Sequence, residues 1–368
     1  MNEENRTLEM PQVDETISKL HYATVRAELK EVWEKAKPYM TGFCRACKVC
    51  NSLNCPVIPT ERAATAERNY RKLQQVKIAY ETIYEGGDGT EIDTSISLFS
   101  HRFHAPIMSA PFGLVNCFNP KTHFKDDYDF TMALLKGTSR LGVFACTPDS
   151  FKPEAFTDPL RAIEDSGLPG IPTIKAWEPE KIQRYIRMAD KVGCMAIAHD
   201  IDCIGLPNKS INGGSKTYPK SAAQLKEIFS ITKTPFILKG VLSVRSAMAA
   251  LESGASGIVV SNHAGNTLDQ ALSTVEVLPA IKAAVGDRMA IIVDGGVRHG
   301  EDVFKMLALG ADAVMLGRPY IIAAEGGEER GVALYTQKII WELMNAMRMS
   351  GCRTLKDITR DHVIITND

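Results

Sequence analysis

Four short stretches in the second half of the chain decide the fold: PFILKG (235–240), GIVVSN (257–262), AIIVDGG (290–296) and AVMLGR (313–318). Each is nearly continuous in apolar or β-branched residues, which is typical of strands that are buried on both faces. Amphipathic stretches such as SVRSAMAALESG (243–254) and GEDVFKMLALG (300–310) lie between them and end in Gly, a common helix stop signal. This half of the chain therefore predicts alternating parallel strands and helices.

The same alternation extends back to about residue 104. Four earlier strand candidates are PIMSAP (106–111), VFACTP (143–148), GIPTIKA (170–176) and CMAIAHDID (194–202). EPEKIQRYIRMADKVG (178–193) is a helical pattern between two of them, and LYTQKIIWELMNAMRMSG (334–351) predicts a closing helix. Eight strands with helical crossovers predict an α/β fold, the (β/α)8 or TIM barrel. An open doubly wound sheet more often has fewer strands.

Two segments fall outside this repeat. Residues 1–100 predict an N-terminal helical extension, with helices near 24–38 and 62–76, and residues 101–368 form the predicted barrel domain. The connection of about 203–234 contains the polar, Gly-rich stretch PNKSINGGSKTYP (207–219). A loop of this length at the catalytic rim predicts a lid over the site.

The bulk composition excludes several classes of function. The chain has 368 residues, 45% of them hydrophobic and 24% charged, which is ordinary for a globular enzyme. A formal net charge of -1 gives no reason to expect nucleic acid or an anionic membrane as a partner. No apolar run approaches the roughly 20 residues of a membrane span. The acidic start MNEENRTLEMPQVDE does not resemble a signal peptide, so we expect a cytoplasmic enzyme with a small-molecule substrate.

Polar residues close four of the predicted strands: Lys239, Ser261-Asn262-His263, Asp294-Gly295-Gly296 and Gly317-Arg318. One such ending would be an ordinary turn, but four in register at the carboxyl ends of barrel strands predict an active site. The last two endings predict a phosphate site, because glycines let backbone N–H groups approach phosphate oxygens. Arg298 or Arg318 can add charge-assisted hydrogen bonds there.

Several of these motifs together resemble one enzyme family. ILKGV, SNHAGNTLD, DGGVRHGEDVFKMLALGA and LGRP, followed by MSGCRTLKDI, are similar to the FMN-dependent α-hydroxy acid oxidase and dehydrogenase family. That family includes glycolate oxidase, lactate oxidase and flavocytochrome lactate dehydrogenases. The resemblance covers the barrel almost end to end and is strongest over 235–358.

The resemblance implies a set of FMN contacts. Lys239 would lie beside flavin N1 and C2=O and stabilise the anionic reduced ring, and Asp294 would bind the ribityl chain. The phosphate would be held by Gly296, Arg298, Gly317 and Arg318. The isoalloxazine would be flanked by Ala110, Pro111 and Thr147, and Ser261 and Gly295 complete the implied cofactor set.

The resemblance also implies the catalytic groups. His263 matches the family's base, which takes a proton from the substrate while the flavin accepts a hydride equivalent. Imidazole suits this role because it takes up and releases a proton near neutral pH. Asp202 falls where the family has an Asp that stabilises the protonated histidine.

The substrate-binding part of the motif departs from the family pattern. The family reads Ser-Asn-His-Gly-Gly-Arg-Gln-Leu-Asp after the sixth strand, and its Arg clamps the substrate carboxylate, but this chain has Asn266 there. The segment 202–207 also lacks the family's second Arg. Lys175 offers a point charge as a partial replacement or is a rim lysine, and His199 and Asp200 add polar groups. An amide cannot form a bidentate ionic clamp, so we expect an alcohol, an amine or a modified 2-hydroxy acid as substrate.

The N-terminal extension contains the run FCRACKVCNSLNCPV (43–57), which places Cys44, Cys47, Cys50 and Cys55 in the spacing C-x2-C-x2-C-x4-C-P. In a reducing compartment such a cluster favours a metal site over disulfides. The spacing is close to a ferredoxin-like run and favours a [4Fe–4S] cluster, with zinc as the alternative. The cluster would either exchange electrons with FMN or only stabilise the fold of this segment.

The sequence therefore leads to an FMN-dependent oxidoreductase that passes a hydride equivalent to or from FMN, with an electron-transfer partner reached through the cluster. An FMN-dependent isomerase with a structural metal site and a conventional lactate-type oxidase are the alternatives. The direction of the reaction stays open. By resemblance alone, we expect a homo-oligomer, namely a tetramer.

Overall fold

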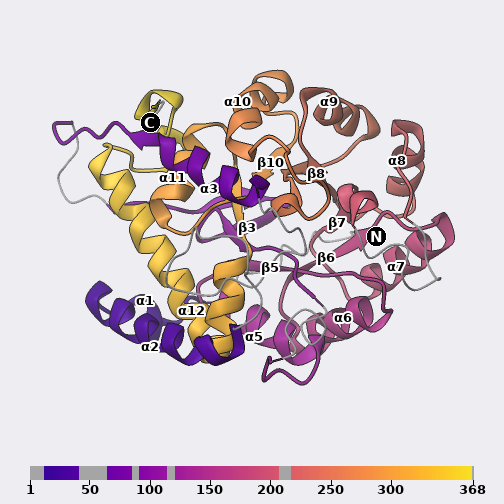
Figure 1. The fold of residues 1–368 in the computed structure, drawn as a ribbon, viewed down its shortest axis with the longest axis horizontal. Coiled ribbons are helices and arrows are strands. Elements are labelled where there is room, and N and C mark those ends of the chain that lie inside the picture. Colours follow the sequence, from indigo (N-terminus) through magenta and orange to yellow (C-terminus); the bar gives the residue numbers. More distant parts are fainter. Residues whose placement is uncertain (1–11, 41–63, 85–90, 114–120, 207–216, 367–368) are drawn as a thin grey trace, which may run out of the picture.

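The computed structural model describes residues 12–40, 64–84, 91–113, 121–206 and 217–366. At its centre, eight parallel strands close into a barrel in which each strand is hydrogen-bonded to its neighbours along the chain and β11 returns to β4 (Figure 1). The strands are β4 (Ile107–Ser109), β5 (Phe144–Thr147), β6 (Gly170–Lys175), β7 (Ile197–Asp200), β8 (Phe236–Val241), β9 (Gly257–Val260), β10 (Ala290–Val293) and β11 (Ala313–Leu316). Each lies within a stretch that the sequence predicts as a strand, except that β8 extends one residue further, to Val241, so the (β/α)8 barrel is confirmed.

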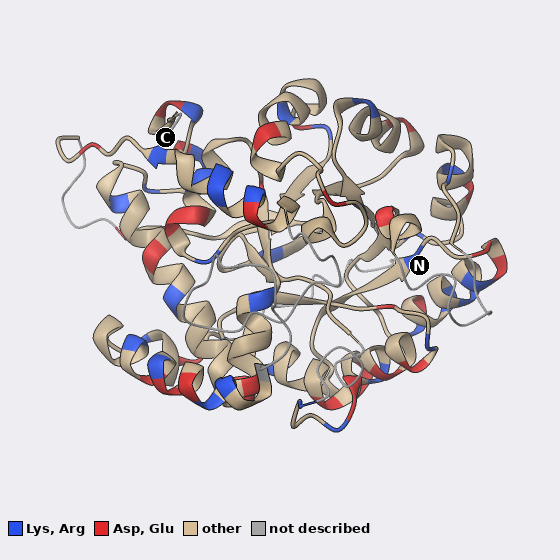
Figure 2. Cartoon of the chain, in the orientation of Figure 1, with Lys and Arg blue, Asp and Glu red and all other residues tan. Residues whose placement is uncertain are grey.

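Helices follow the strands and form the outer layer. They are α5 (Asp127–Ser139), α6 (Glu154–Ser166), α7 (Pro179–Lys191), α8 (Ala222–Phe229), α9 (Val244–Ser253), α10 (Thr274–Val285), α11 (Gly300–Ala308) and α12 (Arg318–Met349). The closing helix was predicted to begin at residue 334, but α12 begins at Arg318, directly after β11. A break at Gly327 and Glu328, where φ is -159° and 46°, divides α12 into two parts. Figure 2 shows that basic and acidic residues both occur along these outer helices.

The hydrophobic core has two layers. One layer lies between the strands and the helices, and the other fills the barrel interior with residues such as Met108, Phe144, Ala198, Ile237 and Ile292. Because side chains alternate along a strand, the residue two positions after an interior residue also points inward. The strand ends therefore place polar residues above the apolar interior, at the carboxyl mouth of the barrel.

A short antiparallel hairpin, β2 (Ile96–Leu98) and β3 (His101–Phe103), closes the opposite end of the barrel. The Phe103 side chain is fully buried in the interior layer, with its ring centroid 4.2 Å from that of Phe144. Phe99, at the tip of the hairpin, contacts Gly257 at the start of β9. The barrel interior is thus closed at this end and open only toward the carboxyl mouth.

The N-terminal helices pack directly on the barrel. α1 (Glu15–Ser18) and α2 (Tyr22–Met40) lie against α12, as Figure 1 shows in indigo and yellow. α3 (Ala64–Gln75) lies against α10 and the short helix η3 (His263–Gly265). β1 (Val76–Ile78) then pairs antiparallel with β12 (Val363–Ile365) near the end of the chain. The helices predicted near 24–38 and 62–76 are confirmed.

None of the helices in the described ranges combines the length and the apolar character that a membrane span needs.

Truncating the hairpin side chain that closes the barrel should destabilise the protein. Replacing the buried Phe103 with Ala removes an aromatic ring from the interior layer and should lower the free energy of unfolding by about 3–5 kcal/mol. Urea denaturation followed by circular dichroism measures this change. Ile83→Ala is the control, because the Ile83 side chain is 96% exposed. Equal stability of the two variants would contradict the role of the hairpin.

Candidate active site

The ends of β6, β7 and β8 carry three charged side chains in one row. The strand register pairs Lys175 with Asp200, and Asp200 with Lys239. Paired residues of neighbouring parallel strands point to the same side, so all three enter the mouth of the barrel. Lys175 Nζ lies 2.9 Å from Asp200 Oδ2, and Lys239 Nζ lies 3.2 Å from Asp200 Oδ1. One carboxylate therefore binds two ammonium groups.

The charges in this row are buried, and they stabilise one another. Burial alone would raise the pKa of Asp200, but the ammonium groups of Lys239 and Lys175 outweigh it and hold the pKa well below its usual range. Burial alone would lower the pKa of Lys239, yet Asp200 and Asp202 raise it above its usual value. All three groups of the row therefore stay ionised at neutral pH.

His263 meets this row from the loop after β9. Its Nδ1 lies 3.1 Å from Asp202 Oδ1, 3.3 Å from Lys239 Nζ and 3.7 Å from Asp200 Oδ1. A carboxylate accepts and an ammonium donates, so the contacts of Nδ1 with Asp202 and with Lys239 need opposite ring tautomers. The shorter contact, with Asp202, favours the proton on Nδ1 and a lone pair on Nε2. The structure brings together the three residues predicted to be catalytic.

Asp200, Asp202 and His263 also lie close enough to one another to hold a metal ion. However, Lys239 Nζ is within hydrogen-bond distance of both Asp200 and His263. Its ammonium group supplies the positive charge that a metal would otherwise bring to these ligands.

Asp202 reaches His263 because the residue after Lys239 has no side chain. Gly240 has a φ of 100°, and a Cβ atom there would lie 2.5 Å from Asp202 Cγ. Asp202 opens the short helix η1 (Asp202–Gly205), which crosses directly over this glycine. Gly240 is not among the predicted site residues, although its position after the strand-ending lysine was a usable signal.

The turn after β10 has unsatisfied polar groups that fit a bound phosphate and polyol. Asp294 Oδ2 accepts a hydrogen bond from Ser261 Oγ at 2.8 Å, and burial raises the pKa of Asp294. Gly295 and Gly296 follow with φ of 101° and 86°. Asp294 Oδ1 and Arg318 Nη1 are buried and have no hydrogen-bond partner among the described residues. Since buried polar atoms are normally paired, these atoms are available to a ligand.

The other predicted cofactor residues lie on the neighbouring strand ends. Gly317 precedes α12, and a Cβ atom there would meet only Ala110, at 3.8 Å, so this approach to the helix N-terminus is open. Pro111 follows Ala110 after β4, and the buried Thr147 ends β5. Arg298 donates from Nη1 to the carbonyl oxygen of the preceding residue at 2.7 Å. The residues predicted to contact FMN therefore lie on neighbouring strand ends at the carboxyl mouth of the barrel.

Two predicted pocket residues, His199 and Asn266, do not take part in the row of charged side chains formed by Lys175, Asp200 and Lys239. Strand alternation points His199 away from Asp200, and its Nδ1 lies 3.0 Å from the carbonyl oxygen of Ile174. Burial lowers the pKa of His199 to about 4, so its ring is neutral. Asn266 lies just after the catalytic turn, and its Oδ1 is buried without a partner among the described residues.

Asp149 is a site residue that the sequence analysis missed. Its Oδ2 accepts hydrogen bonds from Trp177 Nε1 at 2.5 Å and from the backbone N–H of Lys175 at 2.9 Å. Burial raises the pKa of Asp149 to about 6. This carboxyl group holds the end of β6 in place and thereby orients Lys175. Its place directly after a predicted strand end, in TPD, was the available signal.

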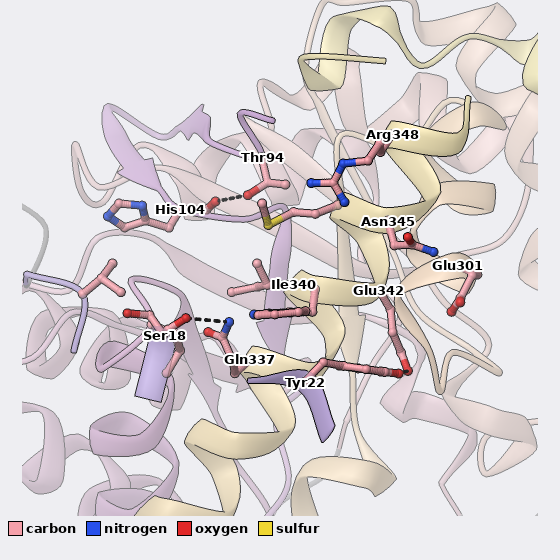
Figure 3. A pocket seen from close by; sticks show the side chains of 14 residues that line it. Ser18, Tyr22, Thr94, His104, Glu301, Gln337, Ile340, Glu342, Asn345 and Arg348 are labelled. Carbon is pink, nitrogen blue, oxygen red and sulfur yellow. Dashed lines mark hydrogen bonds between the residues drawn. The ribbon is translucent and has the colours of Figure 1, made fainter. Parts of the chain in front are cut away.

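Cys44, Cys47, Cys50 and Cys55 lie outside the described residues, as does most of the predicted lid, 207–216. The described part of the chain also has a cavity of about 640 Å³ between α12 and the N-terminal helices (Figure 3). Its wall includes Tyr22, Trp341 and Arg348. None of the residues lining it belongs to the predicted active site.

Comparison with known proteins agrees with this geometry. Residues 59–221 and 212–365 match the model of the family described as FMN-dependent dehydrogenase. An L-lactate dehydrogenase of Bartonella quintana is 30% identical over 349 residues, which cover 82% of this chain and 90% of that protein. A peroxisomal (S)-2-hydroxyacid oxidase of Arabidopsis thaliana is 45% identical over 139 residues, only 38% of each chain.

Among solved structures, mandelate oxidase with (S)-2-phenylpropionate has a TM-score of 0.74 at 27% identity, over 92% of this chain and 98% of that chain. The barrel, the open phosphate turns and the histidine–aspartate–lysine cluster thus occur together in a chain whose family match spans nearly its whole barrel. This chain belongs to the FMN-dependent dehydrogenase family.

Proposed function

We propose that this protein is an FMN-dependent oxidoreductase in which His263 takes up the substrate proton. The observation that carries the proposal is the contact of His263 Nδ1 with Asp202 Oδ1 at 3.1 Å, directly beside the buried ammonium of Lys239. When bound, FMN accepts or supplies the hydride equivalent. We propose an alcohol, an amine or a modified 2-hydroxy acid as substrate.

The residues of the mouth have three proposed roles: proton uptake, stabilisation of negative charge, and binding of FMN. With its Nδ1–H donated to Asp202, His263 presents the Nε2 lone pair to the substrate proton, and Asp202 stabilises the imidazolium that forms. Lys239 stays protonated because of its carboxylate partners, so it stabilises negative charge that develops on a neighbouring ring system. Asp294, the glycine turn and Arg318 would hold the ribityl and phosphate parts of FMN.

The charge balance of the mouth supports a substrate without a clamped carboxylate. Two ammonium groups, on Lys175 and Lys239, face two carboxylates, on Asp200 and Asp202. These four charges sum to zero while His263 is neutral, so they present no net attraction to an anion. Lys175 is occupied by Asp200 and does not replace the missing arginine. Asn266 leaves an unpaired amide oxygen where that arginine would lie.

A conventional 2-hydroxy acid oxidase or dehydrogenase is the second candidate, and the names of the relatives favour it. In that case the carboxylate would be bound by Lys175 after it leaves Asp200, or by residues outside the described ranges. Comparing a hydroxy acid with its neutral ester separates the two candidates.

We also propose that the four-cysteine run binds a [4Fe–4S] cluster that exchanges electrons with FMN. The support is its cysteine spacing and the place where the run joins the barrel. α3 begins nine residues after Cys55, and Thr65 N in its first turn donates to Asp269 Oδ1 at 2.8 Å. Asp269 belongs to the same loop as His263, so the start of α3 is anchored beside the proposed base.

Removing the proposed base should abolish flavin reduction without removing FMN. His263→Ala should slow anaerobic flavin reduction about 10²–10⁴-fold, the usual contribution of a general base. Stopped-flow absorbance with glycolate, L-lactate, (S)-mandelate and their methyl esters measures it. His104→Ala, an exposed histidine at the closed end of the barrel, is the control and should react like the wild type. Unchanged kinetics in the His263 variant would refute the assignment.

Restoring an arginine should create affinity for carboxylates. Asn266→Arg should lower KM for L-lactate or (S)-mandelate about tenfold or more, while the methyl esters gain nothing. Asn266→Gln is the matched control, because it lengthens the side chain without adding charge. If the wild type already prefers the free acids and the arginine brings no gain over glutamine, the conventional alternative holds.

If the four-cysteine run binds a [4Fe–4S] cluster, the purified protein should contain iron. Protein purified without oxygen should contain about four irons per chain and show broad visible absorption beyond the flavin bands, which dithionite bleaches. Cys47→Ser should lose the iron yet retain FMN, whereas Cys194→Ser, a buried barrel cysteine, should keep both. Stoichiometric zinc, or no metal at all, would rule out the electron-transfer role.

A further inference from the structure

Asn69 lies where α3 packs against the turn after β9, which carries His263, and the turn after β10, which carries Gly295 and Gly296. It is on α3, and its side chain is fully buried. Asn69 Nδ2 donates to Asn262 Oδ1 at 2.8 Å, and Asn262 Nδ2 donates back to Asn69 Oδ1 at 2.8 Å. The two amides thus form a closed, reciprocal pair between residues 193 positions apart in sequence.

The remaining hydrogen-bonding capacity of Asn262 is also used. Its Nδ2 donates a second bond to the carbonyl oxygen of Leu272 at 2.9 Å, and its Oδ1 accepts a second bond from Ala264 N at 3.1 Å. Flipping the Asn262 amide would break all of these bonds at once. Asn69 therefore fixes Asn262 in one orientation, because every donor and acceptor of that amide is paired.

The turn that Asn262 holds has an unusual backbone. His263 and Ala264 both have a φ of 52°, and Gly265 follows with a φ of 84°. Positive φ is uncommon for residues other than glycine and persists only where the surroundings impose it. Here Ser261 Oγ accepts from His263 N at 3.2 Å, and Asn262 Oδ1 accepts from the next amide. The direction of the His263 ring thus depends on a backbone that the amide pair supports.

Asn69 also packs against the turn after β10. A Cβ atom at Gly295 would lie 3.0 Å from Asn69 Nδ2, and one at Gly296 would lie 2.8 Å from the Asn69 carbonyl oxygen. Thr274 links the same region, since its N–H donates to Asn69 Oδ1 at 3.4 Å and its Oγ1 donates to the Asp294 carbonyl oxygen at 2.6 Å. The Asn69 side chain therefore bonds to Asn262 of the turn after β9 and lies beside Gly295 of the turn after β10, while its backbone carbonyl lies beside Gly296.

We propose that Asn69 is a positioning residue that sets both the orientation of His263 and the shape of the turn that receives the FMN phosphate. Asn69 acts through Asn262 on the first and by direct contact on the second. Both parts rest on the proposed function: the first on His263 as the proton acceptor, and the second on the glycine turn as a part of the FMN site.

Two variants of the full-length protein test this proposal. Asn69→Ala removes the amide pair without adding charge, and Asn69→Asp keeps the shape but places an acceptor opposite Asn262 Oδ1. In both variants the FMN dissociation constant, measured by flavin fluorescence quenching, should rise about tenfold. Flavin reduction by the best substrate should slow about 10²-fold, as expected for a misplaced reacting group.

Two further readouts separate positioning from a loss of stability. The charged groups around the His263 ring include Asp200, Asp202 and Lys239, and Asp294 lies close enough for its charge to act on the ring. If the ring loses its fixed contact with Asp202, its protonated form is less stabilised, so the acid limb of the pH–rate profile should move to lower pH. The His263 ring resonance in ¹H–¹⁵N spectra, identified by its absence in His263→Ala, should also shift.

Arg68→Ala is the matched control. Arg68 is the residue before Asn69 on α3 and forms an ion pair with Glu276 of α10, with Nε 2.6 Å from Oε2. It touches neither turn, so its variant should bind FMN and reduce it within about twofold of the wild type, as usual for a surface ion pair.

Folded Asn69 variants with wild-type FMN affinity and an unshifted His263 resonance would overturn the proposal, whatever the catalytic rates. If the wild type reduces no substrate, the proposed function fails, but the affinity and the resonance still decide the role of Asn69.

Discussion

The site depends on one buried carboxylate that binds two ammonium groups. Asp200 lies between Lys175 and Lys239 across three neighbouring strands and is 2% exposed. Removing one partner of a buried ion pair typically costs about 3–5 kcal/mol, because the other charge is left unpaired. The ionised Asp200 therefore keeps the buried Lys239 charged. The same carboxylate also pairs with Lys175 inside the mouth of the barrel, so the Lys175 ammonium is not available to bind an incoming anion.

The barrel register creates this cluster from residues that are distant in sequence. Neighbouring parallel strands align Lys175 with Asp200 and Asp200 with Lys239, above an interior filled with apolar side chains. The hairpin with Phe103 closes the other end of that interior. Polar groups consequently collect at one mouth, where the loop carrying His263 and the helix η1 carrying Asp202 meet. The same packing makes the cofactor turns after β10 and β11 neighbours of the catalytic turn.

The N-terminal segment takes part in this arrangement. α3 presents Asn69 to the turns after β9 and β10, and its first turn is bound by Asp269 of the catalytic loop. β1 then pairs with β12 near the end of the chain. α3 is therefore packed on the carboxyl mouth of the barrel, against the turns after β9 and β10.

The eight strands, the polar residues at their ends and the family motif could be read from the sequence, because each depends on local apolar patterning or short spacing. The family resemblance also predicted Lys239, Asp202 and His263 as catalytic residues, and these three lie close together in the structure. It placed His199 beside Asp200, yet strand alternation turns His199 toward a backbone carbonyl. The start of α12, the support from Asp149 and the Asn69–Asn262 pair were also missed. Only the tertiary structure decided these features, because they depend on which side chains meet across strands and helices far apart in the chain, and local pattern carries no record of such contacts.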